Sequence, residues 1–115
     1  MRDSESKIQS DCVRWYTNTY CLAHHSPRCI IWHTPNENQH KHTNLGVLGG
    51  VPDLCLIHMG QLIFIEMKDE KGKLRPAQLD FKKRVEAHGF KWFLCRSLES
   101  FKEIIKKLDK SQAEC

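Results

Sequence analysis

The chain has 115 residues, the usual size of one domain, so we expect a single core over residues 1–115 and no second module. Hydrophobic residues make up 40% of the sequence and charged residues 28%, and no apolar run approaches the ~20 residues of a membrane span. The net charge of +4 permits phosphate binding without requiring it, and the polar first residues lack a signal-peptide core, so we expect a cytoplasmic protein.

The first predicted element is a helix from about Ser4 to Tyr20. Its core stripe follows three- and four-residue spacings and comprises Glu5, Ile8, Cys12, Trp15, Tyr16 and Thr19. Glu5 lies on this stripe one turn before Ile8, so its carboxylate could face the interior. An acidic residue in the first turn also complements the helix dipole, and the pattern does not separate the two roles.

A turn around Ser26-Pro27 precedes a short apolar strand from Cys29 to His33. The polar stretch over residues 34–50 predicts a mobile surface loop, and loops of this length in compact domains are often functional. The loop carries His40, Lys41 and His42. These histidines are candidate zinc ligands or catalytic bases, although a solvated polar loop is the simpler explanation.

The segment VPDLCLIHMGQLIFIEMK, residues 51–68, predicts a β-hairpin whose turn is Met59-Gly60. Residues whose numbers sum to 119 then face each other, which places Asp53 opposite Glu66. Directly opposed like charges destabilise a strand pair by ~0.2–1 kcal/mol unless a cation lies between them. The hairpin therefore predicts a divalent-metal site at its open end.

Glu66 and Lys68 are two residues apart and project from one face of the predicted strand. Apolar residues occupy both faces of this strand, so we expect it to be covered on both sides. Charged groups at the end of a buried strand are costly unless they are paired or metal-bound. We favour this interpretation over the alternative, in which Asp53 caps the strand entrance and Glu66 and Lys68 form a solvated pair.

Pro76 suits the start of a helix and Gly89 its end, which predicts a helix over residues 76–88. Its inward stripe comprises Leu74, Ala77, Gln78, Phe81, Val85 and His88. Gln78 is polar, so it either makes a backbone hydrogen bond at the edge of this stripe or reaches the carboxylate site. A basic face, either solvated or in contact with phosphate, is formed by Lys82, Lys83 and Arg84.

Residues 90–95 predict a fourth strand, and Ser97 is placed to cap a last helix. That helix would bury Leu98, Phe101, Ile104, Ile105 and Leu108, and residues 109–115 are expected to form a frayed tail. The order of elements is helix, three strands, helix, strand and helix. This order predicts an α/β fold, a sheet of about four strands with helices on both faces.

Six cysteines occur without a CxxC pair, and two of them fall inside predicted strands, which favours buried reduced thiols over a disulfide framework. Thiolate and imidazole are the usual ligands of zinc. A structural zinc site is therefore a further hypothesis for Cys21, His24, His25 and Cys29, although their spacing matches no common zinc module.

The run GVPDLCLI, the strand LIFIEMK, Gln78 within RPAQLDF, and the final strand and helix together resemble the VRR-NUC domain of the PD-(D/E)XK nuclease superfamily. The resemblance extends from Glu5 to about Leu108 and includes the tripeptide PNE at residues 35–37. It implies a restriction-endonuclease-like core with a mixed β-sheet. The compact size is similar to the stand-alone viral or bacterial form, which implies the cytoplasm of a bacterium or a phage-infected host.

The resemblance implies a Mg2+- or Mn2+-dependent deoxyribonuclease in which Asp53, Glu66 and the backbone carbonyl of Met67 bind the metal. It implies that Lys68 positions or activates water, with supporting catalytic roles for Glu5 and Gln78. It implies no other small-molecule cofactor and no membrane. The residues expected to contact DNA are Lys41, Lys71, Lys73, Arg75 and Lys82.

We expect structure-selective cleavage of Holliday junctions, flaps or other branched DNA. The resemblance to the stand-alone form implies a homodimer, whose two sites would meet two strands. The alternative is a catalytically inactive nucleic-acid-binding module on the same fold. A third interpretation is a zinc-stabilised interaction domain built on the cysteines and histidines at positions 21–29.

Overall fold

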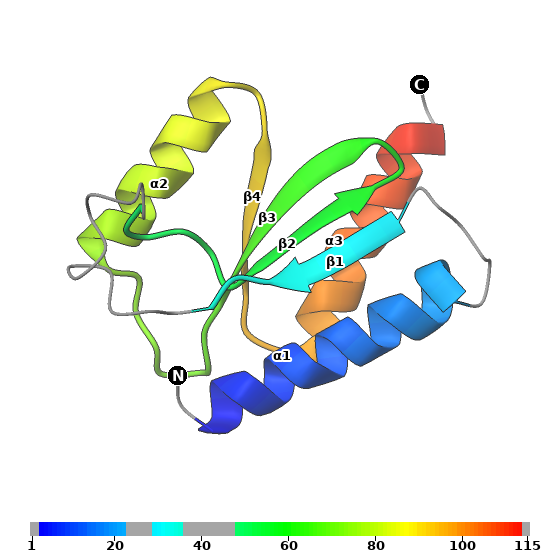
Figure 1. The fold of residues 1–115 in the computed structure, drawn as a ribbon, viewed down its shortest axis with the longest axis horizontal. Coiled ribbons are helices and arrows are strands. Elements are labelled where there is room, and N and C mark those ends of the chain that lie inside the picture. Colours follow the sequence, from blue (N-terminus) through cyan, green and yellow to red (C-terminus); the bar gives the residue numbers. More distant parts are fainter. Residues whose placement is uncertain (1–2, 23–28, 36–47, 114–115) are drawn as a thin grey trace.

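The structure is a computed structural model that describes residues 3–22, 29–35 and 48–113. The elements follow the predicted order (Figure 1). The helical elements are α1 (Asp3–Tyr16), a π-helical continuation η1 (Thr17–Leu22), α2 (Pro76–Ala87) and α3 (Leu98–Ala113). The strands are β1 (Cys29–His33), β2 (Leu54–His58), β3 (Gln61–Met67) and β4 (Lys91–Cys95).

The four strands form one mixed sheet in the order β1-β2-β3-β4, in which β4 runs parallel to β3 and the other pairs are antiparallel. Met59 and Gly60 connect β2 to β3 with φ angles of 51° and 83°. Positive φ at both central residues characterises the type I′ turn of two-residue hairpins. The predicted register is confirmed, because Leu54 pairs with Ile65.

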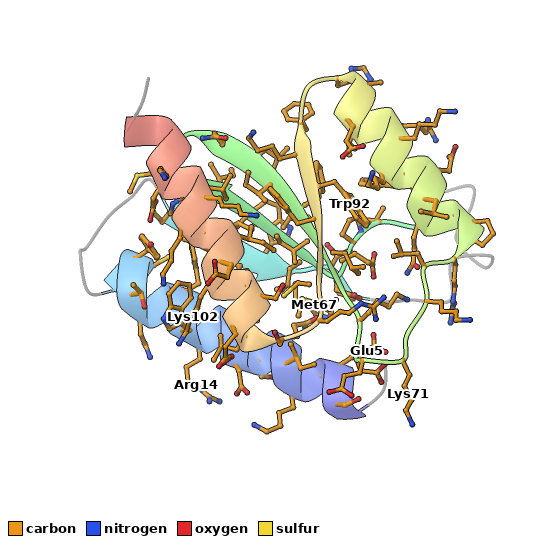
Figure 2. The ribbon with its side chains drawn as sticks, turned by 180° about the vertical axis from the view of Figure 1, so that it is seen from behind. Glu5, Arg14, Met67, Lys71, Trp92 and Lys102 are labelled. Atoms are coloured by element: carbon orange, nitrogen blue, oxygen red, sulfur yellow. The ribbon has the colours of Figure 1, made fainter. Side chains whose placement is uncertain are left out.

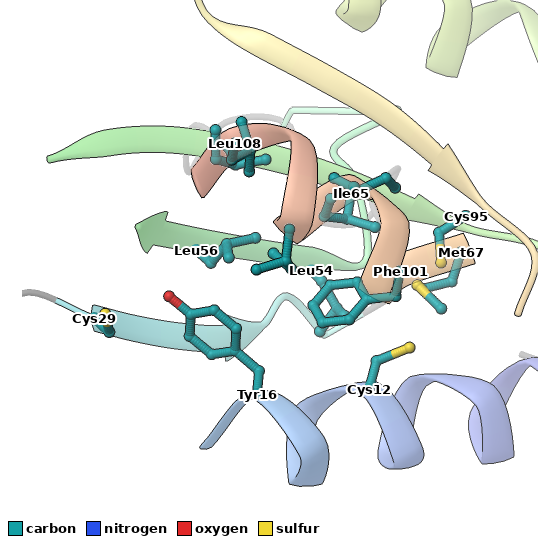
Figure 3. Close-up of a cluster of buried hydrophobic side chains, with 13 residues drawn as sticks. Cys12, Tyr16, Cys29, Leu54, Leu56, Ile65, Met67, Cys95, Phe101 and Leu108 are labelled. Atoms are coloured by element: carbon teal, nitrogen blue, oxygen red, sulfur yellow. The ribbon is translucent and has the colours of Figure 1, made fainter. Parts of the chain in front are cut away.

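The main core lies between the sheet and the helices α1 and α3 (Figure 3). Alternate residues of β2 and β3 point into it, as expected for strands whose successive side chains face opposite ways. Its fully buried members include Tyr16, Leu54, Leu56, Ile63, Ile65, Met67, Phe101 and Ile105. This apolar layer fixes the position of α1 and of β3 relative to each other.

Helix α2 covers the opposite face of the sheet, where Phe64 packs edge to face on Phe81 with ring centroids 5.3 Å apart. Phe64 and Glu66 share this face, since side chains alternate along β3. The chain passes from β3 through α2 to the parallel strand β4. This crossover brings the covering helix close to the end of β3, where the carboxylate site is predicted.

The first helix departs from its predicted form beyond Tyr16, where the α-helix gives way to the wider helical turn of η1. Tyr20 in this segment stacks on Tyr16 with ring centroids 5.1 Å apart. The sequence there contains Thr17 and Thr19, whose branched side chains have low α-helix propensity. The predicted helix is thus present, but it continues past Tyr20 to Leu22, and its last part is π-helical.

The last helix is longer than predicted. It continues past Leu108 to Ala113, so the expectation of a frayed tail over residues 109–115 was wrong for residues 109–113. The Asp109 carboxylate accepts hydrogen bonds from buried His58 at 2.6 Å and from Tyr20 at 2.7 Å. These bonds hold the added turn of α3 against the sheet.

Smaller differences concern single residues. Ala77 and His88, assigned to the inward stripe of α2, are exposed, whereas Phe81 is buried as expected.

The loop expected over residues 34–50 is described only at its two ends, since residues 36–47 lie outside the described part. Five cysteines are described, and all five are free thiols, as expected. Among the described residues, no helix has the length and apolarity needed to cross a membrane.

Candidate active site

The two predicted carboxylates meet at the open end of the β2–β3 hairpin. Asp53 immediately precedes β2, and the register that pairs Leu54 with Ile65 continues across to Glu66. The Oδ2 atom of Asp53 accepts a hydrogen bond from the backbone N–H of Met67 at 3.2 Å. Glu66 is only 2% exposed, and its buried Oε1 atom has no hydrogen-bond partner among the described residues.

The surroundings of Glu66 raise its pKa to about 9. Burial is the largest cause, followed by a hydrogen bond with Asp53 and the negative charges of Asp53 and Glu5, while the charge of Lys68 acts in the opposite direction. Carboxylates accept hydrogen bonds but cannot donate them, so a link between Glu66 and Asp53 requires a proton or a cation. The pair is thus suited to exchange a proton for a metal ion.

The end of β1 fixes the backbone of Asp53. The Asp53 carbonyl accepts a hydrogen bond from the Thr34 N–H at 2.8 Å and lies 3.1 Å from Nδ1 of His33. The same nitrogen of His33 is 3.0 Å from Nε2 of Gln9 on α1. The Thr34 bond attaches Asp53 to the end of β1, while Nδ1 of His33 either donates to the Asp53 carbonyl or accepts from Gln9.

Gln78 reaches the carboxylates from α2. Its Oε1 accepts a hydrogen bond from the backbone N–H of Arg75 at 2.8 Å, the arrangement of a helix capping box. Because this bond identifies the oxygen of the amide, the Nε2 group is the one that donates to Oε2 of Glu66, at 3.2 Å. Gln78 therefore combines both roles considered from the sequence: it bonds to the backbone and orients Glu66.

Glu5 approaches the site from the first turn of α1. It is half-buried, and its negative charge contributes to the raised pKa of Glu66. Figure 2 shows Glu5 and Lys71 close to each other, where the start of α1 meets the segment after β3. Glu5 thus lies in the first turn of α1 and acts electrostatically on Glu66, so its position fits both roles considered from the sequence.

Lys68 follows β3 directly and is 8% exposed. Its backbone N–H donates a hydrogen bond to the carbonyl of Cys95 at 3.0 Å, which extends the pairing of β3 with β4 by one residue. Its charge lowers the pKa of Glu66, which places the ammonium within electrostatic reach of the carboxylates. The fold therefore brings five of the predicted site residues to one place, namely Asp53, Glu66, Lys68, Gln78 and Glu5.

The residues expected to contact DNA lie in different surroundings. Lys71, Lys73 and Arg75 are exposed in the segment that connects β3 to α2. Lys82 forms an ion pair with Glu86 at 3.1 Å and lies 5.6 Å from the ring centroid of Trp92, so a DNA contact would compete with both. The predictions for Lys41 and for the tripeptide PNE fall within residues 35–47, of which only Pro35 is described.

The described residues contain no group of three or more His, Cys, Asp or Glu side chains that could hold a metal ion. A metal at Asp53 and Glu66 therefore requires other oxygen ligands, of which the predicted carbonyl of Met67 is one.

The four residues of the zinc hypothesis are described only in part. Of these residues, Cys21 donates a hydrogen bond from Sγ to the carbonyl of Cys29 at 3.2 Å. His24 and His25 lie outside the described residues.

Two residues near the site were not identified from the sequence. The first is Gly50, whose φ angle is +80° and on which a Cβ atom would lie 2.2 Å from the carbonyl oxygen of Ala77. Glycine is therefore required where the chain passes α2 to reach Asp53. Arg96 contacts the segment after Lys68 from more than twenty residues away. No local pattern indicates such a contact, whereas Asp69 in DEKG begins a recognisable Asp-x-x-Gly turn.

A family model described as the VRR-NUC domain matches residues 3–99 of the chain. A solved structure described as a VRR_NUC domain protein is similar in fold, with a TM-score of 0.69 and 20% sequence identity over 89% of this chain and 84% of that chain. A search of curated proteins finds no significant match. The α/β architecture expected from the sequence is thus confirmed by the observed mixed sheet and by this structural similarity.

Proposed function

Since the chain belongs to the VRR-NUC domain family, we propose that it is a metal-dependent endonuclease that hydrolyses DNA phosphodiester bonds. The observation that carries this proposal is the convergence of two carboxyls, of which one is buried with an unpartnered oxygen. A structural protein has no evident use for two opposed acids at the end of a buried strand, since their proximity is costly.

Mg2+ or Mn2+ is the proposed cofactor, because carboxylate and carbonyl oxygens are the ligands that these hard cations prefer. Asp53, Glu66 and the carbonyl of Met67 would hold it. The buried, unpartnered Oε1 of Glu66 fits such a role, since a cation would supply the interaction that this oxygen lacks. A bound divalent cation lowers the pKa of a water molecule and offsets the negative charge of a phosphate.

The protein side chains would supply positioning and charge. The ammonium of Lys68, whose charge lowers the pKa of Glu66, would stabilise the negative charge that develops on the phosphate as the attacking water adds. Gln78 holds Glu66 in one orientation through a hydrogen bond of 3.2 Å. Glu5 adds a further negative charge from α1, which strengthens the preference of the site for a cation.

The exposed basic residues Lys71, Lys73 and Arg75 border this site and would contact the DNA backbone. For the substrate we propose branched DNA, such as Holliday junctions or flaps, cleaved by a homodimer that presents two sites. Light scattering combined with size-exclusion chromatography tests the dimer. A monomer at working concentration would count against paired cutting of a junction.

The central experiment is a cleavage panel of labelled junction, flap, nicked, linear and single-stranded DNA with Mg2+ or Mn2+. We expect the wild type to cut at least one substrate and the variants Asp53→Ala, Glu66→Ala and Lys68→Ala to cut none detectably. Arg14→Gln serves as a matched loss of charge, because Arg14 is an exposed residue of α1 that pairs only with Asp11 among the described residues, at 3.6 Å.

Two results would contradict this proposal. Cleavage by Lys68→Ala at the wild-type rate would remove the lysine from the mechanism. Binding of these DNAs by the wild type without turnover in either metal would instead identify a catalytically inactive nucleic-acid-binding module.

A further inference from the structure

The segment between β3 and α2 folds over the side chain of Lys68. A Cβ atom built on Gly72 would lie 3.1 Å from Cδ of Lys68 and 3.3 Å from its Cβ. The absence of a side chain at Gly72 thus allows the backbone to pack on the aliphatic part of the lysine. Lys68 is 8% exposed, which is low for a residue type that is rarely buried.

Arg96 holds this segment in place from the end of β4. Its Nη1 atom donates hydrogen bonds to the carbonyl of Asp69 at 2.6 Å and to that of Gly72 at 2.8 Å, and the carbonyl of Glu70 lies 3.5 Å away. Three carbonyl oxygens therefore converge on one guanidinium group. The preceding residue, Cys95, accepts the backbone hydrogen bond of Lys68, so the end of β4 contacts both the lysine and the segment that covers it.

Asp69 completes the fold of this segment, which we call the lysine cover (residues 69–72). Its Oδ1 accepts hydrogen bonds from the backbone N–H groups of Lys71 at 3.0 Å and Gly72 at 2.7 Å. Its Oδ2 accepts a hydrogen bond from the Ser4 hydroxyl at 3.0 Å. The lysine cover is thus joined both to β4 and to the first turn of α1, which carries Glu5.

We propose that Arg96 is a positioning residue that fixes the Lys68 side chain through the lysine cover. This inference rests on the proposed function, in which Lys68 acts on the scissile phosphate. A lysine side chain has several rotatable bonds, so an unrestrained ammonium spends little time in any one place. Catalysis depends steeply on such placement, and a misplacement of about 1 Å can lower a rate by about a hundredfold.

Two variants test this role from opposite sides of the contact. Arg96→Gln removes the guanidinium, and Gly72→Ala keeps it but places a methyl group against the stem of Lys68. We expect each to lower kcat by about tenfold or more while the Kd for DNA, measured without divalent metal, changes by less than about threefold. Arg96→Lys should restore only part of the rate, since one ammonium replaces a planar group of five donors.

The controls match these changes. Arg14→Gln removes an exposed arginine of α1, and Gly49→Ala adds a methyl group where no atom lies within 4 Å. Both should cleave DNA at the wild-type rate. If Arg96→Gln does not fold, Gly72→Ala still tests the contact, because it removes neither the guanidinium of Arg96 nor any of the carbonyl groups that accept from it.

Trypsin provides a readout that needs no nuclease activity. It cleaves after lysine, and Lys71 and Lys73 are exposed in or beside the lysine cover. We expect Arg96→Gln to be cut there at least about tenfold faster than the wild type, because the cover loses the bonds that keep it closed. Circular dichroism at the same temperature verifies that the rest of the fold is intact.

The outcomes separate the two proposals. An active wild type whose Arg96→Gln and Gly72→Ala variants retain its kcat would overturn the role of Arg96 and leave the nuclease function standing. A weaker Kd for DNA with unchanged kcat would also overturn it, since the cover would then act by holding Lys71 against DNA. A wild type inactive on every substrate would overturn the nuclease function, and with it any positioning of Lys68 for catalysis.

Discussion

Glu66 is a carboxyl group whose protonation is set by its neighbours. Burial and the adjacent Asp53 raise its pKa from 4.5 to about 9, so the folded protein keeps a proton that the unfolded chain releases. Between these two values the folded state binds more protons than the unfolded state. The contribution of Glu66 to the free energy of unfolding is therefore at its full value below about pH 4.5, and it decreases as the pH rises toward about 9.

We predict that the metal-free wild type loses stability over this range more steeply than Glu66→Gln, because the amide does not titrate. Urea unfolding followed by tryptophan fluorescence at about pH 5, 7 and 9 measures the difference. Glu99→Gln, which alters an exposed acid in the first turn of α3, is the matched control. Equal pH slopes for the wild type and Glu66→Gln would show that Glu66 titrates normally.

Gln78 offers a second test at the scale of one side chain. The variant Gln78→Glu keeps an acceptor for the backbone N–H of Arg75, but it replaces the donor to Glu66 with a negative charge. We expect cleavage to fall by about 10- to 100-fold, the usual effect of losing a group that orients a metal ligand. Single-turnover kinetics measure the rate. His88→Gln, a change at the exposed C-terminal cap of the same helix, should have no effect. Wild-type cleavage by Gln78→Glu would exclude an orienting role.

At the scale of the elements, a polar network holds the end of α3 against the sheet. This network lies near the Met59-Gly60 turn, at the opposite end of the hairpin from Asp53 and Glu66. His58 is fully buried, and its Nδ1 lies 2.8 Å from the Tyr16 hydroxyl and its Nε2 2.6 Å from Asp109. The Asp109 carboxylate accepts from the Nε2–H group of His58, and the Tyr16 hydroxyl, which can either donate or accept, bonds to Nδ1. The network thus joins α1, β2 and α3.

Asp109→Ala should destabilise the protein by about 1–3 kcal/mol, because it leaves the buried Nε2–H group of His58 without its acceptor. Thermal and urea unfolding measure this loss, and Lys110→Ala, an exposed neighbour, should change little. DNA cleavage at a temperature where both variants are folded should match the wild type, since the network lies away from the active site. An Asp109→Ala protein as stable as the wild type would contradict the role assigned to this turn.

At the scale of the whole molecule, the proposed metal should act as a ligand of the folded state only. The carboxylates are adjacent after the hairpin forms and are separated in the unfolded chain, so metal binding is coupled to folding. Mn2+ at about ten times its Kd should stabilise the wild type by about 1.4 kcal/mol.

Differential scanning calorimetry without DNA tests this prediction. The Tm of the wild type should rise with Mn2+ concentration, whereas the Tm of Asp53→Ala and Glu66→Ala should not. This measurement is independent of catalysis, so it separates metal binding from cleavage. A wild-type Tm that does not respond to millimolar Mn2+ would exclude a site of useful affinity.

Much of the fold follows from short-range patterns in the sequence. The two apolar runs and the Met59-Gly60 turn between them determine the hairpin and its register, and this register sets Asp53 and Glu66 opposite each other at its open end. Ser97 accepts a hydrogen bond from the backbone N–H of Ser100 at 3.1 Å, as predicted for a helix cap. These features involve residues close in the chain, or facing each other across one turn, so local geometry is sufficient to specify them.

Other features depend on packing between distant segments. The length of α3 is decided by the contact of Asp109 with His58, and the lysine cover is held by Arg96. Gly50 is required because Ala77 lies against it. The sequence alone therefore determined the element order and the opposed carboxylates, while the tertiary structure decided how Glu66 and Lys68 are oriented, because hydrogen bonds between distant residues form only after the layers have packed.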